Sequence, residues 1–176
     1  MVKNILITGG AGYIGAHVTE ILLKKNKNVF LIDNLSTGHR KLINSKAKFF
    51  KIDIKNKQKV KKIIEKYKID SIIHLAANLI IGEGQRKPNK YYKNNVLGTK
   101  KLLDACKDTT IKNFIFSSTA AIYKEGQYKV SENSIIKPKS IYGQTKIKAE
   151  KIIKSFAKKN KINYGILRYF NIAGAS

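Results

Sequence analysis

Apolar residues along this chain gather in short runs that alternate with longer amphipathic segments. The runs are apolar almost throughout and lie near residues 3–8, 28–33, 48–52, 70–75, 112–117 and 162–168. Between them, apolar residues recur at helical spacing near 13–25, 57–67, 89–106 and 140–159. Strands without polar alternation, separated by helices, are typical of a parallel sheet covered on both faces. The pattern predicts a doubly wound α/β fold with strand order 3-2-1-4-5-6.

Length and composition predict one domain, residues 1–176, that lies in the cytoplasm. The 176 residues suffice for one sizeable core, and no repeat or linker divides them. No apolar run approaches the roughly 20 residues of a membrane span. The first strand begins too close to Met1 for a signal peptide. Cys106 is the single cysteine and the three histidines are scattered, so neither a disulfide framework nor a metal site is expected.

The formal net charge of +25 raises the question of a nucleic-acid partner. Arginine occurs only at positions 40, 86 and 168, so the other 33 of the 36 basic residues are lysines. Nucleic-acid sites favour the planar fork of arginine, and these lysines are spread through every helix and loop. Solvated lysine faces are therefore the favoured interpretation, and no nucleic-acid or membrane partner is expected.

A glycine cluster joins the first apolar run to the first helical segment. Gly9, Gly12 and Gly15 fall on this strand-to-helix turn, although Gly10, Gly12 and Gly15 fit GxGxxG spacing too. Glycines here allow a tight bend, a close approach of phosphate and close packing of helix on strand. Such turns also occur for steric reasons alone. The flanking strand and helix favour a dinucleotide pyrophosphate bound at the helix N-terminus.

An acid ends the second apolar run. Asp33 follows Gly15 by 18 positions, close to the ~20 expected for a carboxylate that hydrogen-bonds a ribose 2′-hydroxyl. It is either that residue or an ordinary turn aspartate in the segment 33–38. A carboxylate at the ribose favours NAD, because the 2′-phosphate of NADP would meet like charge.

A tyrosine and a lysine open the last helical segment. Tyr142 and Lys146 are at i and i+4, and hence on one helix face. An ammonium near a phenol lowers the phenol pKa, which makes tyrosine a usable general base near neutral pH. Such a spacing also arises by chance in a lysine-rich chain. Hydroxyls at Ser117 to Thr119 strengthen the prediction, because they end a buried strand where ligands of open α/β sheets bind.

Seven segments occur in order along the chain, and together they resemble the sugar-nucleotide epimerases and dehydratases of the extended short-chain dehydrogenase/reductase family. They are 8–15 (TGGAGYIG), 33–38 (DNLSTG), 74–77 (HLAA), 91–96 (YYKNNV), 117–123 (SSTAAIY), 142–146 (YGQTK) and 167–175 (LRYFNIAGA). The resemblance is greatest to the 4-epimerases and covers the whole chain. It implies a Rossmann fold with bound NAD, a UDP-sugar substrate and, in full-length members, a homodimer.

The resemblance also implies roles for individual residues. Cofactor contacts are implied for Gly9, Gly12, Tyr13, Ile14, Gly15, Asp33, Asn34, Leu35, Ser36, Thr37, Gly38, Asp53, Ile54, Leu75, Ala76, Ala77, Leu79 and Asn94. Lys146 would hold the nicotinamide ribose and Phe170 would pack near the nicotinamide. Asn171 would touch the sugar nucleotide, while Thr119 and Tyr142 would act on the hexose.

The implied reaction interconverts UDP-glucose and UDP-galactose. Tyr142 takes the proton of the sugar 4-hydroxyl, a hydride leaves the same carbon for NAD, and the 4-keto sugar turns over before the hydride returns. Family members are about twice as long, so the C-terminal substrate lobe is missing here. The activity of this chain alone is therefore expected to be weak, and the preferred UDP-hexose stays open.

Two alternatives to the 4-epimerase stay open. Another NAD-dependent epimerase or a dehydratase is the first, although dehydratases carry an acidic pair where Ala120 and Ala121 stand here. A catalytically silent nucleotide-binding or RNA-binding remnant is the second. Leu79 is a further departure, because the family often has lysine at this position.

Overall fold

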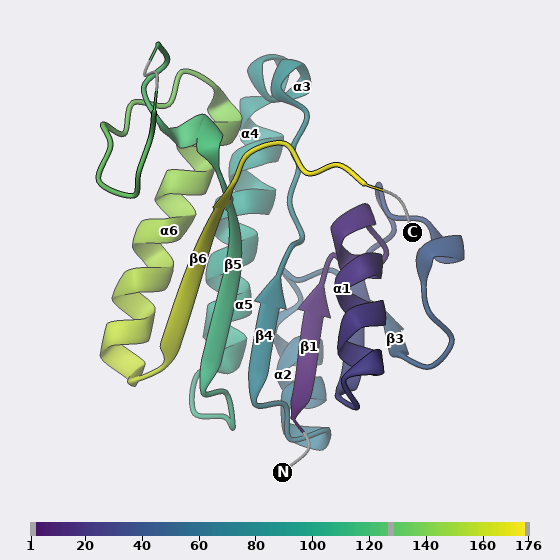
Figure 1. Ribbon diagram of the computed structural model, residues 1–176. Coiled ribbons are helices and arrows are strands. Elements are labelled where there is room, and N and C mark those ends of the chain that lie inside the picture. Colours follow the sequence, from purple (N-terminus) through teal and green to yellow (C-terminus); the bar gives the residue numbers. More distant parts are fainter. Residues whose placement is uncertain (1–2, 127–128, 175–176) are drawn as a thin grey trace.

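Six parallel strands form one sheet in the order β3-β2-β1-β4-β5-β6 (Figure 1), which confirms the predicted topology. The computed structural model describes residues 3–126 and 129–174, so Ala175 of the last family-like segment lies outside the described residues. The strands are β1 (Asn4–Thr8), β2 (Asn28–Asp33), β3 (Lys48–Lys51), β4 (Ser71–His74), β5 (Asn113–Thr119) and β6 (Asn163–Tyr169). The sheet reverses its direction of growth between β1 and β4, where ligands of this fold class bind.

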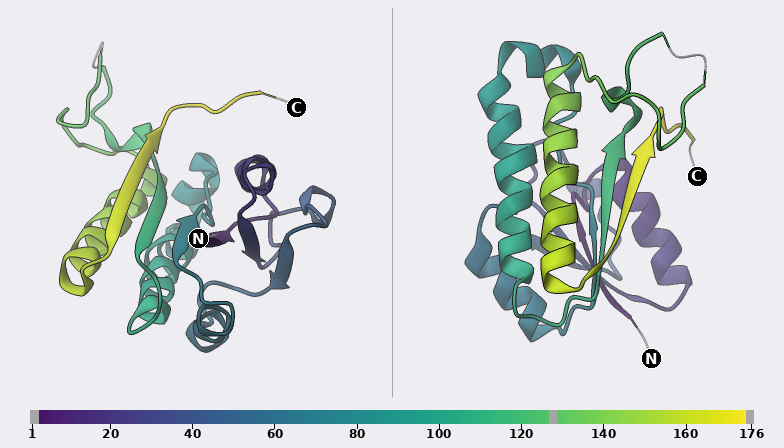
Figure 2. Two further views of the ribbon diagram at one scale, coloured as in Figure 1. Left: turned by 60° about the horizontal axis from the view of Figure 1, so that its bottom comes forward. Right: turned by 90° about the vertical axis from the view of Figure 1, so that its left-hand side faces the viewer.

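Helices cover both faces of the sheet (Figure 2). On one face lies α1 (Tyr13–Lys24), and on the other lie α2 (Lys57–Lys66), α5 (Thr99–Cys106) and α6 (Ile141–Asn160) side by side. The remaining helices are η1 (Arg40–Leu42), α3 (Ile81–Arg86), α4 (Pro88–Tyr91), η2 (Tyr92–Gly98) and η3 (Ala120–Ile122). Within the described residues, no helix is long and apolar enough to cross a membrane.

Alternate residues of each central strand enter two different cores. Ile5 and Ile7 of β1 pack with Leu31 under α1, whereas Leu6 packs with Ile72 of β4 and the helices of the other face. Both sets are almost inaccessible to solvent. Successive side chains of a strand point to opposite faces, so a strand buried on both faces must be apolar throughout. This explains the unbroken apolar runs in the sequence.

The helix predicted over 89–106 is a composite. It begins as α4 at Pro88, passes through a π-helical segment at η2 and continues as α5. The wider turn of a π-helix inserts an extra residue and is frequent at functional sites. The short helices α3, η1 and η3 were not predicted, because elements of three to six residues leave no periodic pattern. Strand β5 also runs two residues further than predicted, to Thr119.

The chain beyond β6 crosses the carboxyl ends of the central strands (Figure 1). It runs from Phe170 toward the start of α1, where the Tyr13 hydroxyl donates a hydrogen bond to the carbonyl of Gly174. This crossing brings residues from the two ends of the sequence to the same edge of the sheet.

Candidate active site

The glycine turn leaves a cradle of backbone between β1 and α1. Gly9 has φ +75°, and a Cβ atom there would lie 2.7 Å from the backbone nitrogen of Ala76. Gly12 caps α1 without a side-chain hydrogen bond, so the first N–H groups of the helix point outward without helical acceptors. Gly10 instead packs against the side chain of Leu31. The geometry therefore favours the register that begins at Gly9, and an anion fits the helix N-terminus.

A cavity of about 350 Å³ opens at this turn. Most of the residues that the sequence assigns to a cofactor line it: Gly9, Gly12, Tyr13, Ile14, Gly15, Asp33, Asn34, Ser36, Thr37, Gly38, Ile54, Leu75, Ala76, Ala77, Leu79 and Asn94. They come from five separate stretches of chain, which meet around the carboxyl ends of β1, β2 and β4. An elongated ligand with an anionic centre would fit this cavity.

The Asp33 carboxylate at the end of β2 is held by two backbone N–H groups. One oxygen accepts from Leu35 at 2.7 Å and the other accepts from Ala11 at 3.1 Å. Leu35 has a positive φ of 59°, which turns the chain back over the carboxylate. A carboxylate oxygen accepts more than one hydrogen bond, so Asp33 has capacity left for a ligand hydroxyl.

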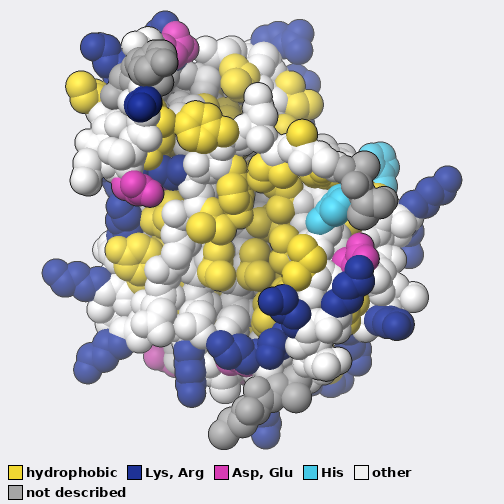
Figure 3. All heavy atoms as spheres, viewed as in Figure 1, with side chains coloured by type: hydrophobic (Ala, Val, Ile, Leu, Met, Phe, Trp, Pro, Cys, Tyr) yellow, Lys and Arg dark blue, Asp and Glu magenta, His cyan; other side chains and the backbone are white. Residues whose placement is uncertain are grey.

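A second cavity, of about 640 Å³, continues from the first. The two share Tyr13, Ile14, Leu75, Ala77 and Leu79. The rest of the second cavity is formed by the end of β5, the start of α6 and the segment after β6, with Thr119, Tyr142, Lys146, Phe170 and Asn171 among its residues. Figure 3 shows hydrophobic side chains gathered over the middle of this face, with lysine and arginine around its margin.

Helix α6 carries the tyrosine and the lysine into this cavity. Ser140 caps the helix by accepting from the Gly143 N–H at 3.0 Å, which sets Tyr142 in the first turn. Lys146 lies one turn further and is only 2% exposed. Its Nζ donates to the carbonyl of Ser117 at 2.7 Å and lies 4.7 Å from the centre of the Phe116 ring. The strand end of β5 thus fixes the lysine.

Burial sets the protonation of both groups. Desolvation lowers the pKa of Lys146 to about 7, although the charge of Glu150 raises it. Burial raises the pKa of Tyr142, and hydrogen bonding by Thr119 offsets only part of that shift. The lowered phenol pKa expected from the neighbouring ammonium is therefore not found. Lys146 Nζ lies 5.7 Å from the centre of the phenol ring and is bound to Ser117 instead.

Comparisons with known proteins agree with this arrangement. The family model described as NAD dependent epimerase/dehydratase family matches residues 5–176. The chain belongs to this family. It is 44% identical over 174 residues to the UDP-glucose 4-epimerase of Lactobacillus helveticus, covering 98% of this chain and 53% of that protein.

Solved structures of family members superpose closely. A UDP-glucose 4-epimerase from Brucella ovis in complex with NAD has a TM-score of 0.95 and 39% identity, covering 99% of this chain and 54% of that chain. The UDP-Glc/GlcNAc 4-epimerase from Campylobacter jejuni has a TM-score of 0.92 and 40% identity, covering 99% and 55%. The chain thus spans about half the length of the relatives it matches.

Four residues assigned to the cofactor by resemblance lie apart from the glycine cavity. Lys146 and Phe170 line the second cavity only. Leu35 and Asp53 line neither, but both support it. The Leu35 N–H holds Asp33, while Asp53 accepts from the Asn34 amide at 3.0 Å. Leu79, where the family often has lysine, lines both cavities and is 65% exposed.

Several residues around the site were missed by the sequence reasoning. Ile32, Ile52 and Asn78 line the first cavity. Asn95 is buried in the π-helical segment and holds Asn78 from both sides, accepting from its N–H at 2.8 Å and donating to its carbonyl at 2.9 Å. The pair 94–95 inside the family-like segment 91–96 was the available signal, but only Asn94 was assigned.

His74 joins the same framework from the end of β4. Its Nδ1 accepts from the Thr8 hydroxyl at 2.7 Å, and its Nε2 donates to Thr99 at 2.9 Å, since the Thr99 hydroxyl itself donates to Asn95. Burial and the charge of Lys146 lower its pKa to about 3, so the ring is neutral. His74 thus ties β1 and β4 to the helix behind the site.

Proposed function

We propose that this chain carries the NAD site and the catalytic residues of a UDP-glucose 4-epimerase, which interconverts UDP-glucose and UDP-galactose. The observation that supports this best is the continuity of the two cavities. The glycine cradle and Asp33 lie in one, while Tyr142, Lys146 and Thr119 lie in the other. A cofactor bound along the first cavity would therefore present its reactive end to the tyrosine in the second.

The residues present fit NAD. The Gly9 cradle and the start of α1 would bind the pyrophosphate, Asp33 the adenosine ribose and Lys146 the nicotinamide ribose. No described arginine lines the cavity to accept the 2′-phosphate of NADP. When bound, NAD in its oxidised form would supply a hydride acceptor and a positive charge.

Tyr142 would exchange a proton with O4 of the hexose. The raised pKa keeps the phenol protonated near neutral pH, and a cation in the site would favour the phenolate that acts as base. Thr119, at the end of β5, would hold the same sugar hydroxyl. Lys146 would orient the ribose and stabilise the phenolate, and Phe170 and Asn171 would cover the nicotinamide and the sugar nucleotide.

Elimination of water, as in the dehydratases of the family, has less support. Ala120 and Ala121 both line the second cavity, and its described lining residues include no carboxylate. A dehydratase needs an acid and a base there in addition to the tyrosine, because it removes both a hydroxyl and a proton from the 4-keto sugar.

The test is conversion of UDP-galactose to UDP-glucose by the 176-residue chain, alone and mixed with the C-terminal half of the Lactobacillus helveticus relative. We expect weak turnover alone and clear turnover in the mixture, because remote substrate contacts supply several kcal/mol of the barrier. Tyr142→Phe should then lower turnover about 10²–10⁴-fold with NAD binding kept.

Tyr67→Phe is the matched control, since this tyrosine at the end of α2 lines neither cavity. It should leave turnover and NAD binding unchanged. No turnover in either arrangement, with NAD bound, would reject the epimerase activity. Near-normal turnover of Tyr142→Phe would place the base elsewhere.

A further inference from the structure

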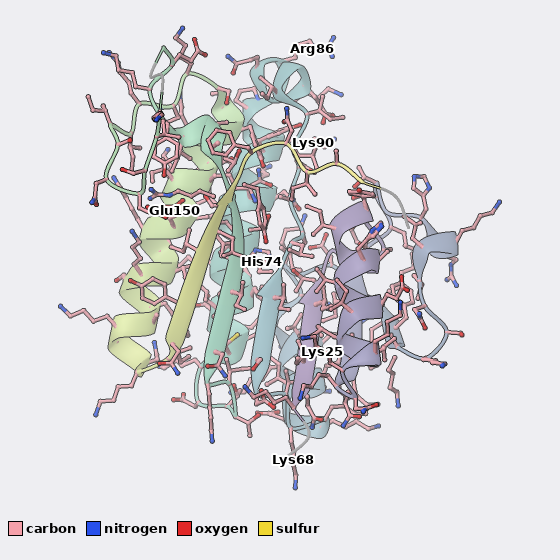
Figure 4. All side chains as sticks on the ribbon, in the orientation of Figure 1. Lys25, Lys68, His74, Arg86, Lys90 and Glu150 are labelled. Atoms are coloured by element: carbon pink, nitrogen blue, oxygen red, sulfur yellow. The ribbon has the colours of Figure 1, made fainter. Side chains whose placement is uncertain are left out.

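A carboxylate is fully buried directly behind the catalytic pair. Glu150 is the only acid in α6 and lies one helical turn after Lys146, with no exposed surface. In Figure 4 its side chain lies on the face of α6 that is turned toward β5 and β6. A buried carboxylate is costly unless it is paired and hydrogen-bonded. Its partners therefore show what the position is built for.

Both oxygens of Glu150 accept hydrogen bonds from side chains of β5 and β6, the two neighbouring strands at one edge of the sheet. Oε1 accepts from the Ser118 hydroxyl at 2.5 Å and from Arg168 Nε at 3.2 Å. Oε2 accepts from Arg168 Nη2 at 2.8 Å. The arginine thus grips the carboxylate in the bidentate arrangement that gives strong, well-oriented pairs. Glu150 joins α6, β5 and β6 at a single point.

The arginine is itself held by the loop beyond β5. Its Nη1 donates to the Tyr123 hydroxyl at 3.0 Å and to the Glu132 carbonyl at 3.1 Å. Hydrogen bonding to Glu150 raises the pKa of Arg168 further above its ordinary value. Four hydrogen bonds therefore hold the arginine, which in turn holds the carboxylate of Glu150.

The same strand end serves the lysine and the glutamate. The Ser117 carbonyl accepts from Lys146, and the next residue, Ser118, donates to Glu150. Successive turns of α6 are thereby fastened to successive residues of β5. We propose that Glu150 is a positioning residue for Lys146: its buried carboxylate supplies the counter-charge of the lysine and fastens the catalytic turn of α6 to the end of β5.

The charges around Lys146 are consistent with this role. Tyr142 faces it from the same helix, His74 from β4, and Arg168 and Tyr123 lie on the far side of Glu150. His74 is neutral and Arg168 is a cation, so Glu150 is the group here that favours the ammonium. Burial lowers the pKa of Lys146 to about 7, and the Glu150 charge opposes that shift. Loss of the carboxylate would remove this opposing charge from Lys146 and the ion-pair partner from Arg168.

The role in catalysis rests on the proposed function, but its test does not require a sugar. The 176-residue chain is prepared with ¹³Cε-labelled lysine. The NMR signal of Lys146 is identified as the one that disappears in Lys146→Arg, and its chemical shift is then followed as a function of pH. In Glu150→Gln, which keeps size and loses charge, the Lys146 midpoint should fall by about one unit or more. Glu150→Asp keeps the charge and should bring the midpoint back to within about half a unit of wild type.

Glu65→Gln, an exposed carboxylate on α2, is the control and should not move the Lys146 midpoint. A folded Glu150→Gln protein with an unchanged midpoint would show a packing role only and would overturn the proposal. If Glu150→Gln does not fold, the ¹³Cδ signal of Glu150 in the wild type decides, since a protonated carboxyl at pH 7 cannot be a counter-charge. If the epimerase assay shows no turnover but Lys146 titrates as expected in the variants, the epimerase proposal is rejected. The electrostatic effect of Glu150 on Lys146 then still stands.

Discussion

One added methyl group at Gly15 should separate the start of α1 from the glycine turn. A Cβ atom at Gly15 would lie 2.8 Å from the Cα of Gly10 and nearer still to the carbonyl oxygen of Gly9. Both neighbours are backbone, so no side-chain rotation relieves the contact. Gly15→Ala therefore requires α1 to move away from the end of β1.

The cost follows from overpacking. Extra atoms forced into a packed interior destabilise a protein by about 1–3 kcal/mol. Alanine gains about 0.5–1 kcal/mol over glycine inside a helix, which offsets only part of this. The net cost is then about 0–2.5 kcal/mol, and at about 2–4 °C per kcal/mol for a chain of this size Tm falls by up to about 10 °C. NAD should bind more weakly, by about tenfold for each 1.4 kcal/mol of interaction that the displaced cradle loses.

The assay is thermal unfolding by circular dichroism together with NAD titration by fluorescence. Gly82→Ala is the matched control, because it adds the same methyl group inside α3 where no atom lies within 4 Å. It should leave Tm unchanged or raise it slightly, with normal NAD binding. A Gly15→Ala protein with the wild-type Tm and NAD affinity would refute the argument from close approach.

Two further predictions concern charge. The pKa of Lys146 is about 7 in the folded protein and about 10.5 in the unfolded chain. Between these two pH values the unfolded chain binds a proton on Lys146 that the folded protein does not. The lysine therefore destabilises the fold increasingly as pH falls from about 10.5 to about 7. Lys146→Met should thus raise the free energy of unfolding at pH 7 by about 1–4 kcal/mol. Denaturant titrations should show that this gain vanishes near pH 10.5. An equal gain at both pH values would contradict the prediction. Asp33→Ala should weaken NAD binding by about 1.5–3 kcal/mol and should weaken NADP binding less. Parallel titrations with both cofactors would measure the two changes. An unchanged preference for NAD would contradict the role of Asp33 at the ribose.

Local patterns alone specified the fold, the glycine turn and the acid of the first cavity, whereas the family resemblance was needed for the cavity residues at 54, 75–77, 79 and 94. The strand order followed from apolar runs separated by helices, because only a sheet covered on both faces needs strands without polar alternation. The turn at Gly9 to Gly15 and the acid at Asp33 lie within one β-α-β unit, where neighbouring segments also lie together in space. All the residues that form such a short-range motif can therefore be recognised in one stretch of the sequence.

Tertiary structure decided the electrostatics of the second cavity. The raised pKa of Tyr142 depends on burial by segments far apart in the chain, and the spacing from Tyr142 to Lys146 could not show that the ammonium would bind Ser117 instead. Likewise the sequence shows Glu150 only as one acid in a lysine-rich helix. The fold is what brings Ser118 of β5 and Arg168 of β6 into hydrogen-bond contact with it. The sequence by itself determined which residues would stand at the edge of the sheet. Only the tertiary structure decided their charge states, because desolvation and pairing depend on what the fold brings around each group.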